Sequence, residues 1–134
     1  MYIIVSVNHD TTNNSSSWTS NTGAYLRPFF QAGCADNCSE NSAALRAIAQ
    51  GLRHVLNTFG PDFGAINVMV PSAKLAKELT AVTTSSLSTK MGDDAAIWAE
   101  IAGCKEKSAI VFGSCLRELS GLVTPFIGWN AGAM

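Results

Sequence analysis

The order of segments in the first half of the chain limits the folds open to it. Residues 2–7 are apolar and rich in β-branched side chains, which predicts a strand. Residues 39–57 carry apolar side chains at helical spacing, and Ser39 is a natural N-cap for that helix. A helix with so wide an apolar stripe needs another layer to pack on. A strand followed by such a helix therefore predicts an α/β fold.

The segments between these two are polar or interrupted. Residues 11–21 predict either a long hairpin loop or a short edge strand through Trp18 with a turn on each side. Residues 23–31 predict a second strand, in which Pro28 favours an edge or a bend. This part of the chain is therefore expected to form the border of the sheet.

The second half of the chain adds a buried strand and further helices. Residues 65–70 form a short, continuously apolar run, which is typical of a strand covered on both faces. We expect this strand to pair beside residues 2–7 in the middle of a mixed sheet, with helix 39–57 on one face. Other patterns predict short helices opening at Pro71-Ser72 and at Asp93-Asp94, a loop at 80–90, a strand at 108–112 and a helix at 115–122. The chain is thus predicted to be a single domain, residues 1–134.

Charged residues are scarce in this chain. They make up 14% of it, with a net charge of −1, where about 25% is usual. No basic run is present of the kind that tight, non-specific nucleic-acid binding requires. Weak nucleic-acid binding stays open, because Lys74 and Lys77 share a predicted helix face and Lys105 and Lys107 lie close together. A surface with few charges favours a protein partner or self-association into an oligomer.

Cysteine content and hydropathy bear on the location of the protein. The four cysteines are too few and too widely spaced for a secreted disulfide scaffold, and their spacing is not the one that zinc sites prefer. No apolar run reaches the roughly 20 residues of a membrane span, and no signal peptide is recognisable. We therefore expect a cytoplasmic protein with free thiols and no membrane contact.

Two features of the sequence resemble the ribonuclease H-like family. Asp10 follows the first predicted strand, and a polar turn then leads to Gly23-Ala24-Tyr25-Leu26. Glu40 opens the long helix and is followed by Ala43-Ala44-Leu45. The resemblance covers most of the chain and implies a ribonuclease H-like mixed sheet flanked by helices.

The resemblance also implies a metal-dependent chemistry and shows where this sequence departs from it. The family cleaves phosphodiesters with two metal ions about 4 Å apart, and three or four carboxylates must converge to hold two Mg²⁺ ions. Asp10 and Glu40 would be the first two catalytic and metal-binding acids. An alternative register places Ala44 at the second position. The third acid would end strand 65–70, where this chain has Pro71-Ser72.

Two functions follow from the missing third acid. The first is a non-catalytic ribonuclease H-like module without a cofactor, acting by protein or weak nucleic-acid binding as an adaptor or as a virus- or phage-encoded antagonist. The second is a divergent Mg²⁺-dependent nuclease that uses Asp10, Glu40 and a displaced acid, such as Glu118, Asp93 or Asp94. The place of Glu118, on the last predicted helix, does not match the family's fourth acid convincingly.

The expected binding surface is the sheet edge near residues 23–31 together with the loop around Trp18. We predict that Trp18, Arg27 and Phe29 contribute to binding, since Trp18 is an aromatic residue in a polar stretch and few charges protect this edge from pairing. Either Phe29 or Phe30 must face the core, so only one of the two is expected to be exposed.

Overall fold

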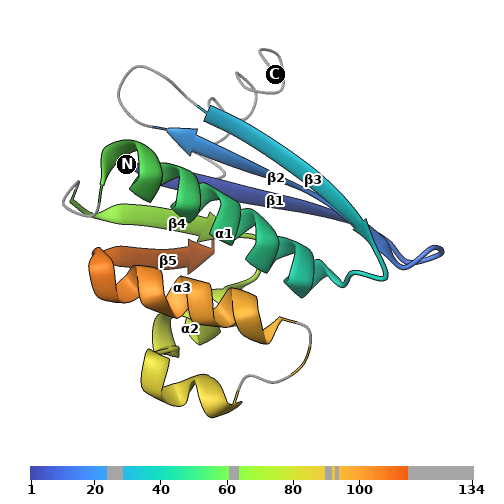
Figure 1. Cartoon of the computed structure of the whole chain (residues 1–134). Helices are drawn as coiled ribbons and strands as arrows, with labels where there is room; N and C mark the ends of the chain where they lie inside the picture. Colours follow the sequence, from blue (N-terminus) through green and yellow to red (C-terminus); the bar gives the residue numbers. More distant parts are fainter. Residues whose placement is uncertain (24–28, 61–63, 90–91, 93, 115–134) are drawn as a thin grey trace.

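The computed structural model describes residues 1–23, 29–60, 64–89, 92 and 94–114. One mixed sheet of five strands runs in the order β3-β2-β1-β4-β5, and α1 crosses one of its faces (Figure 1). The elements in chain order are β1 (Tyr2–Asp10), β2 (Ser15–Gly23), β3 (Phe29–Asp36), α1 (Glu40–Phe59), β4 (Ile66–Val70), α2 (Ala73–Ala81), the 3₁₀ helix η1 (Thr84–Thr89), α3 (Ala95–Lys107) and β5 (Ile110–Ser114).

The centre of the sheet is formed by the two most apolar strands. β1 pairs antiparallel with β2 and parallel with β4, with Ile3 opposite Val68. Ile3, Val5 and Val68 are almost completely buried and belong to the same hydrophobic core as the buried residues of α1. The predicted pairing of residues 65–70 beside residues 2–7 is therefore confirmed, because both strands supply the β-branched side chains that fill a covered face.

Helix α1 begins at the expected N-cap and ends at a glycine. The backbone N–H of Ser42 donates to Ser39 Oγ at 3.1 Å, which confirms Ser39 as the N-cap. Gly60, with a φ of 81°, ends the helix. Leu45, Ile48, Leu52 and Val55 form the buried stripe that packs on the sheet. A wide apolar stripe of this kind supplies most of the stability of such a helix.

Polar contacts cap α2 and link α3 to α1. Ser72 caps α2, since its Oγ accepts from the backbone N–H of Leu75 at 3.2 Å. Asp94, just before α3, accepts a hydrogen bond from Ser42 Oγ of α1 at 2.7 Å. Arg53 of α1 and Glu100 of α3 form an ion pair at 2.8 Å on the surface. Helices α1 and α3 are therefore linked at two points along their length.

The structure corrects the predicted strands between β1 and α1. β2 is a strand of nine residues and lies between β1 and β3. Of the two alternatives for residues 11–21, the strand through Trp18 is therefore present, but it is neither short nor at the edge, and the long hairpin loop is wrong. The next strand begins at Phe29 and extends to Asp36, beyond the predicted range of 23–31, whose residues 24–28 lie outside the described chain. Ser, Thr, Ala and Gly dominate β2 and β3, and such residues give a weak strand pattern until they are paired.

Two further differences concern the second half of the chain. The predicted loop at 80–90 contains the 3₁₀ helix η1, and the predicted strand 108–112 is β5, shifted by two residues. The predicted helix at 115–122 lies outside the described residues. In the described ranges, no helix has both the length and the hydropathy needed to span a bilayer.

Candidate functional site

The resemblance places metal chemistry where β1 and β4 run side by side. Tyr2, Ile3 and Ile4 of β1 lie opposite Asn67, Val68 and Met69 of β4. Continuing this register by two residues puts Ser6 beside Pro71, directly after the end of β4. Neither residue is an acid, and Pro71 offers neither a side-chain ligand nor a backbone N–H.

Asp10 lies farther along β1, at the tip of the β1–β2 hairpin. It is four residues beyond Ser6, which is about 13 Å along an extended strand. The carboxylate accepts hydrogen bonds from the Asn13 side chain at 2.8 Å and from the backbone N–H groups of Thr12 at 2.9 Å and Asn13 at 3.4 Å. The Asn13 side chain, followed by these backbone donors, lowers the pKa of Asp10 below its usual value of 3.8. Asp10 is thus an ionised carboxylate that closes a turn.

Glu40 is the first residue of α1 and is exposed. An acid in the first turn suits the positive end of the helix dipole. Ala44, the residue at the second acid position in the alternative register, is 2% exposed and belongs to the core. In neither register, therefore, does a described contact bring an acid of α1 to the position of Ser6 and Pro71.

The hairpin tip and the start of α1 are joined by a buried polar link. The backbone N–H of Cys38 donates to Asn14 O at 3.1 Å. Ser16 Oγ donates to Cys38 O at 2.6 Å and lies 2.7 Å from His9 Nδ1. The Ser16 hydroxyl donates its proton to a carbonyl, and Ser16 is only 3% exposed. We therefore assign this serine–histidine pair a structural role and not one in nucleophilic attack. The sequence alone did not indicate this pair, because His9 and Ser16 are brought together only by the register of the β1–β2 hairpin.

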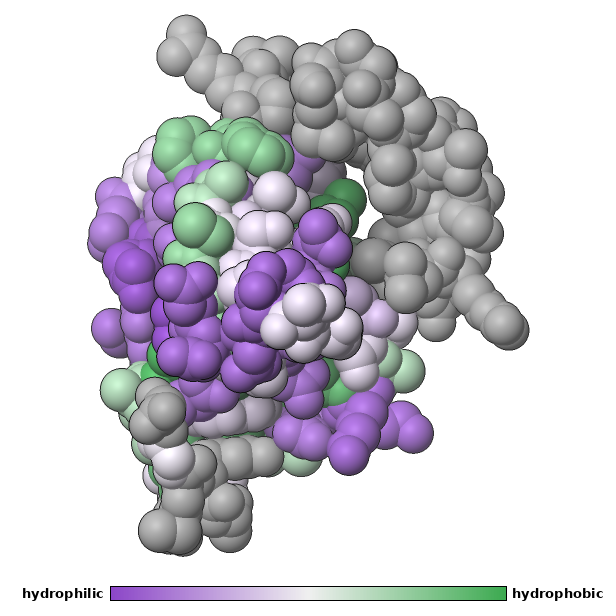
Figure 2. Space-filling view, turned by 90° about the vertical axis from the view of Figure 1, so that its right-hand side faces the viewer, coloured by the Kyte–Doolittle hydropathy of each residue, from purple (hydrophilic) through white to green (hydrophobic). Residues whose placement is uncertain are grey.

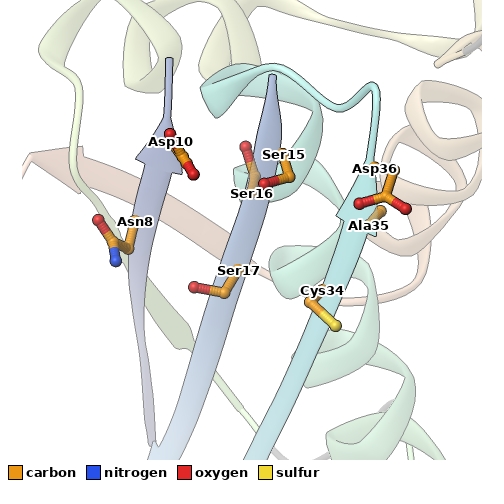
Figure 3. Close-up of a pocket in the computed structure, with 8 residues that line it drawn as sticks. All are labelled: Asn8, Asp10, Ser15, Ser16, Ser17, Cys34, Ala35 and Asp36. Atoms are coloured by element: carbon orange, nitrogen blue, oxygen red, sulfur yellow. The ribbon is translucent and has the colours of Figure 1, made fainter. Parts of the chain in front are cut away.

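A shallow polar pocket lies at the same end of the sheet, on the face opposite α1 (Figure 3). Its volume is about 530 Å³, and its lining comes from β1, β2 and β3: Asn8, Asp10, Ser15, Ser16, Ser17, Cys34, Ala35 and Asp36. Asp10, Ser15 and Asp36 form one row across the three strands, and Asn8, Ser17 and Cys34 form the next. Sequence reasoning missed Asp36 and Cys34, because only the register of β3 brings them beside β1.

The pocket does not assemble a metal centre from the residues described. Asp10 and Asp36 are separated by strand β2, which places their backbones about 10 Å apart. Within the described residues, no group of three His, Cys, Asp or Glu side chains is arranged to hold a metal ion. Two Mg²⁺ ions need more carboxylate oxygens, closer together. Of the proposed displaced acids, Asp94 is bonded to Ser42, while Asp93 and Glu118 lie outside the described residues.

Trp18 does not occupy the surface that was predicted for it. It is 6% exposed and faces α1 from the middle of β2, because alternate residues of this strand point to the core. Its Nε1 donates to Gln50 Oε1 at 3.1 Å, and the guanidinium of Arg46 lies 5.8 Å from the ring centre. The indole also packs directly on Gly33 of β3. Trp18 is therefore a core residue that joins α1 to the edge of the sheet.

The other predicted binding residues lie at or near the start of β3. Phe29 is 40% exposed and stacks on His54 of α1, with ring centres 3.7 Å apart. Phe30 is 53% exposed, so the expectation that only one of the two phenyl groups would be exposed is wrong. The reason is that the two side chains point to opposite faces of the strand: Phe29 lies on the α1 side, which α1 covers only in part here, and Phe30 lies on the other face. Arg27 lies outside the described residues.

Comparison with known proteins identifies the architecture. No family model and no curated protein matches the sequence. Among solved structures, LC11-RNase H1, determined in complex with an RNA/DNA hybrid, is 16% identical, with a TM-score of 0.67 over 87% of this chain and 86% of that chain. The N-terminal RNase H domain of Rv2228c from Mycobacterium tuberculosis is 13% identical, with a TM-score of 0.57 over 88% and 89%.

A viral enzyme contains a similar domain within a longer chain. The prototype foamy virus protease-reverse transcriptase is 17% identical, with a TM-score of 0.63 over 98% of this chain. This chain spans only 19% of the length of that enzyme. Identities this low establish a common architecture and nothing about activity. The five-stranded mixed sheet and its helices therefore give this chain a ribonuclease H-like fold.

Proposed function

We propose that this chain is a non-catalytic ribonuclease H-like module that acts by binding, with a protein as its main partner. The observation that carries the proposal is the β1–β4 register, which pairs Ile4 with Met69 and, continued by two residues, sets Ser6 level with Pro71. At this point the two-metal reaction needs converging carboxylates, and two neutral residues stand there instead.

The remaining acids do not compensate for this loss in the part of the chain described. Asp10 is already held by the hairpin turn, and Glu40 is an exposed residue at a helix start. Each would have to bind a metal ion alone, and a single carboxylate leaves most of the octahedral positions of Mg²⁺ to water. The proposed module therefore acts without a metal cofactor.

The charges near the pocket favour a protein over a nucleic acid. Asp10 and Asp36 line the pocket, and their negative charges oppose the approach of phosphates. Several basic groups are already engaged: Arg46 with Trp18, Arg53 with Glu100, and Lys105 with backbone carbonyls. Hydrophilic residues predominate on the side where the hairpin projects (Figure 2). An adaptor, or an antagonist encoded by a virus or phage, would use a binding module of this kind.

A nuclease assay tests the proposal directly. The protein is incubated with Mg²⁺ or Mn²⁺ and an RNA–DNA hybrid, RNA or single-stranded DNA, and no cleavage above background is expected. Asp10→Asn and Glu118→Gln are assayed beside it, with Asp36→Asn as a control from the same pocket. Cleavage that chelation abolishes, and that Asp10→Asn and Glu118→Gln remove while Asp36→Asn retains it, would establish a divergent nuclease instead.

Hybrid binding is measured on the same samples. We expect weak binding that falls steeply as salt rises, because any affinity would come from scattered lysines and counterion release. Tight binding that resists salt would contradict a protein partner as the main ligand, even if no cleavage occurs.

A further inference from the structure

The outer edge of β3 is the surface that most clearly lacks a partner within the described fold. β3 is the terminal strand of the sheet, and no other described strand pairs with its outer side. Its pairing with β2 is continuous over eight residues, with no bulge. Proteins usually protect such edges with lysine, proline or a bulge, and Phe29–Asp36 contains none of these. The only charge on the strand is Asp36, at its end.

The sequence of β3 is complementary to itself. Its first two residues, Phe29 and Phe30, are large and exposed. The later residues Gly33, Cys34 and Ala35 are small. When a strand of this kind pairs antiparallel with a second copy of itself, each large side chain meets a small one on the partner. Cross-strand neighbours of matched shape are the unit from which sheets gain stability.

We propose that two copies of this chain associate by antiparallel pairing of their β3 strands around a two-fold axis at Ala32. In this register Phe29 lies opposite the partner's Ala35, and Phe30 lies opposite the partner's Cys34. The result is an isologous dimer with one continuous sheet, the commonest form of closed assembly. This inference does not depend on the proposed function, because a nuclease and a binding module can both dimerise at this edge.

Other registers are less favourable for physical reasons. Shifting the pairing by one residue would set a side chain from the α1 face of one copy opposite a side chain from the other face of its partner. An axis at Gly33 places Phe30 against the partner's Asp36 and leaves Phe29 without a cross-strand neighbour. An axis at Cys34 leaves both phenyl groups outside the paired region. An axis at Gln31 also sets both phenyl groups opposite small residues, but it pairs only residues 29–33 of β3, whereas the axis at Ala32 pairs residues 29–35 and keeps Asp36 out of the contact.

The described helices and the net charge permit this approach. Helix α1 lies mainly over β1 and β2, so it leaves the outer side of β3 accessible (Figure 1). The net charge of −1 per chain gives little repulsion between copies. The pocket beside β3 would become part of a continuous open face shared by both copies.

The first test measures the mass of the protein in solution. Sedimentation equilibrium should give twice the chain mass of 14.1 kDa. Ala32→Lys places two ammonium groups across the axis and should weaken dimerisation by at least about tenfold, since like charges opposed across strands repel. Val111→Lys is the matched control, because Val111 is an exposed residue on β5, the opposite edge strand. A monomeric wild-type protein, or equal effects of the two lysine variants, would overturn the proposal.

The second test determines the register. In a background with Cys34→Ser and Cys115→Ser, Ala32→Cys should form an intermolecular disulfide when diamide is added, because opposed residues in antiparallel strands have suitable Cα separations. Val111→Cys in the same background should not. Cross-linking of the wild-type protein through Cys34, with none in the Ala32→Cys variant, would show a shifted register and would contradict the axis at Ala32.

Discussion

Lys105 illustrates how a single side chain can hold two helices together. Its Nζ donates to three carbonyl oxygens at the end of α2, those of Leu79 at 2.7 Å, Thr80 at 2.8 Å and Val82 at 2.6 Å. The last carbonyls of a helix have no partner within it, and a cation there also complements the helix dipole. Lys105, a residue of α3, therefore caps α2 from a neighbouring helix.

Replacement of this lysine should destabilise the fold. Lys105→Met keeps much of the aliphatic chain and removes the ammonium group, and we expect a loss of about 1.5–3 kcal/mol in the free energy of unfolding, as for hydrogen bonds to charged groups. Lys107→Met, an exposed neighbour on the same helix, is the control and should change little. Urea denaturation gives both values. Equal stability of the two variants would show that the carbonyl contacts contribute nothing.

Asp10 makes a pH-dependent contribution at the hairpin tip. Its pKa in the folded protein is lowered, first by the Asn13 side chain, so its stabilising effect is complete above the usual value of 3.8 and is lost as pH falls through the folded pKa. Asp10→Asn should therefore be slightly less stable than the wild-type protein near neutral pH and equally stable at strongly acidic pH. Thermal unfolding across this range measures the difference. A difference that stays constant down to the acid limit would exclude this role.

At the scale of elements, the distance between α1 and the sheet is set by a glycine. A Cβ placed on Gly51 would lie 2.7 Å from Ser20 Oγ and 2.8 Å from Ile3 Cγ2, which is closer than real Cβ atoms come. Both neighbours are fully buried in strands β1 and β2. Gly51 thus allows close contact in the middle of α1, at the cost of a residue with poor helix propensity.

Two helical glycines should respond to the same substitution with opposite signs. Gly51→Ala is expected to destabilise the protein by about 1–3 kcal/mol, because the added methyl group overpacks the core. Gly103→Ala in α3 meets no atom within 4 Å and should stabilise the protein by up to about 1 kcal/mol through helix propensity. Chemical denaturation of the two variants provides the comparison. Stabilisation by Gly51→Ala would mean that the helix and the sheet are farther apart.

At the scale of the whole molecule, the β1–β4 register decides whether metal chemistry is available. The register depends on contacts between strands that are far apart in the sequence. In a fold of this kind, acids on neighbouring strands come close together only if the register places them side by side. Here β1 continues four residues past Ser6 before it reaches its acid. Asp10 thereby becomes part of the hairpin tip instead of the strand junction.

Magnesium should accordingly have little effect on stability. A ligand that binds only the folded state at 100 times its Kd adds about 2.7 kcal/mol, so an assembled site would raise the melting temperature clearly. We expect the melting temperatures in excess MgCl₂ and in EDTA to agree, with NaCl of matched ionic strength as the control. An increase that Asp10→Asn removes would reveal a metal site that uses this carboxylate.

The sequence by itself determined the elements with strong local patterns. Helix α1 with its Ser39 cap, and the paired strands β1 and β4, follow from periodicity and from β-branched content, which act over a few neighbouring residues. The mixed α/β sheet could be inferred from their order, and the absence of an acid at Pro71 could be seen directly.

The tertiary structure alone decided the rest. β2 and β3 are built largely from small polar and small apolar residues, so their extent and their order in the sheet are set by the pairing of β2 with β1 and of β3 with β2. That pairing turns Trp18 toward α1, exposes both Phe29 and Phe30, and brings Asp36 level with Asp10. These outcomes depend on strand register, which is fixed by long-range contacts between segments whose own sequences do not encode it.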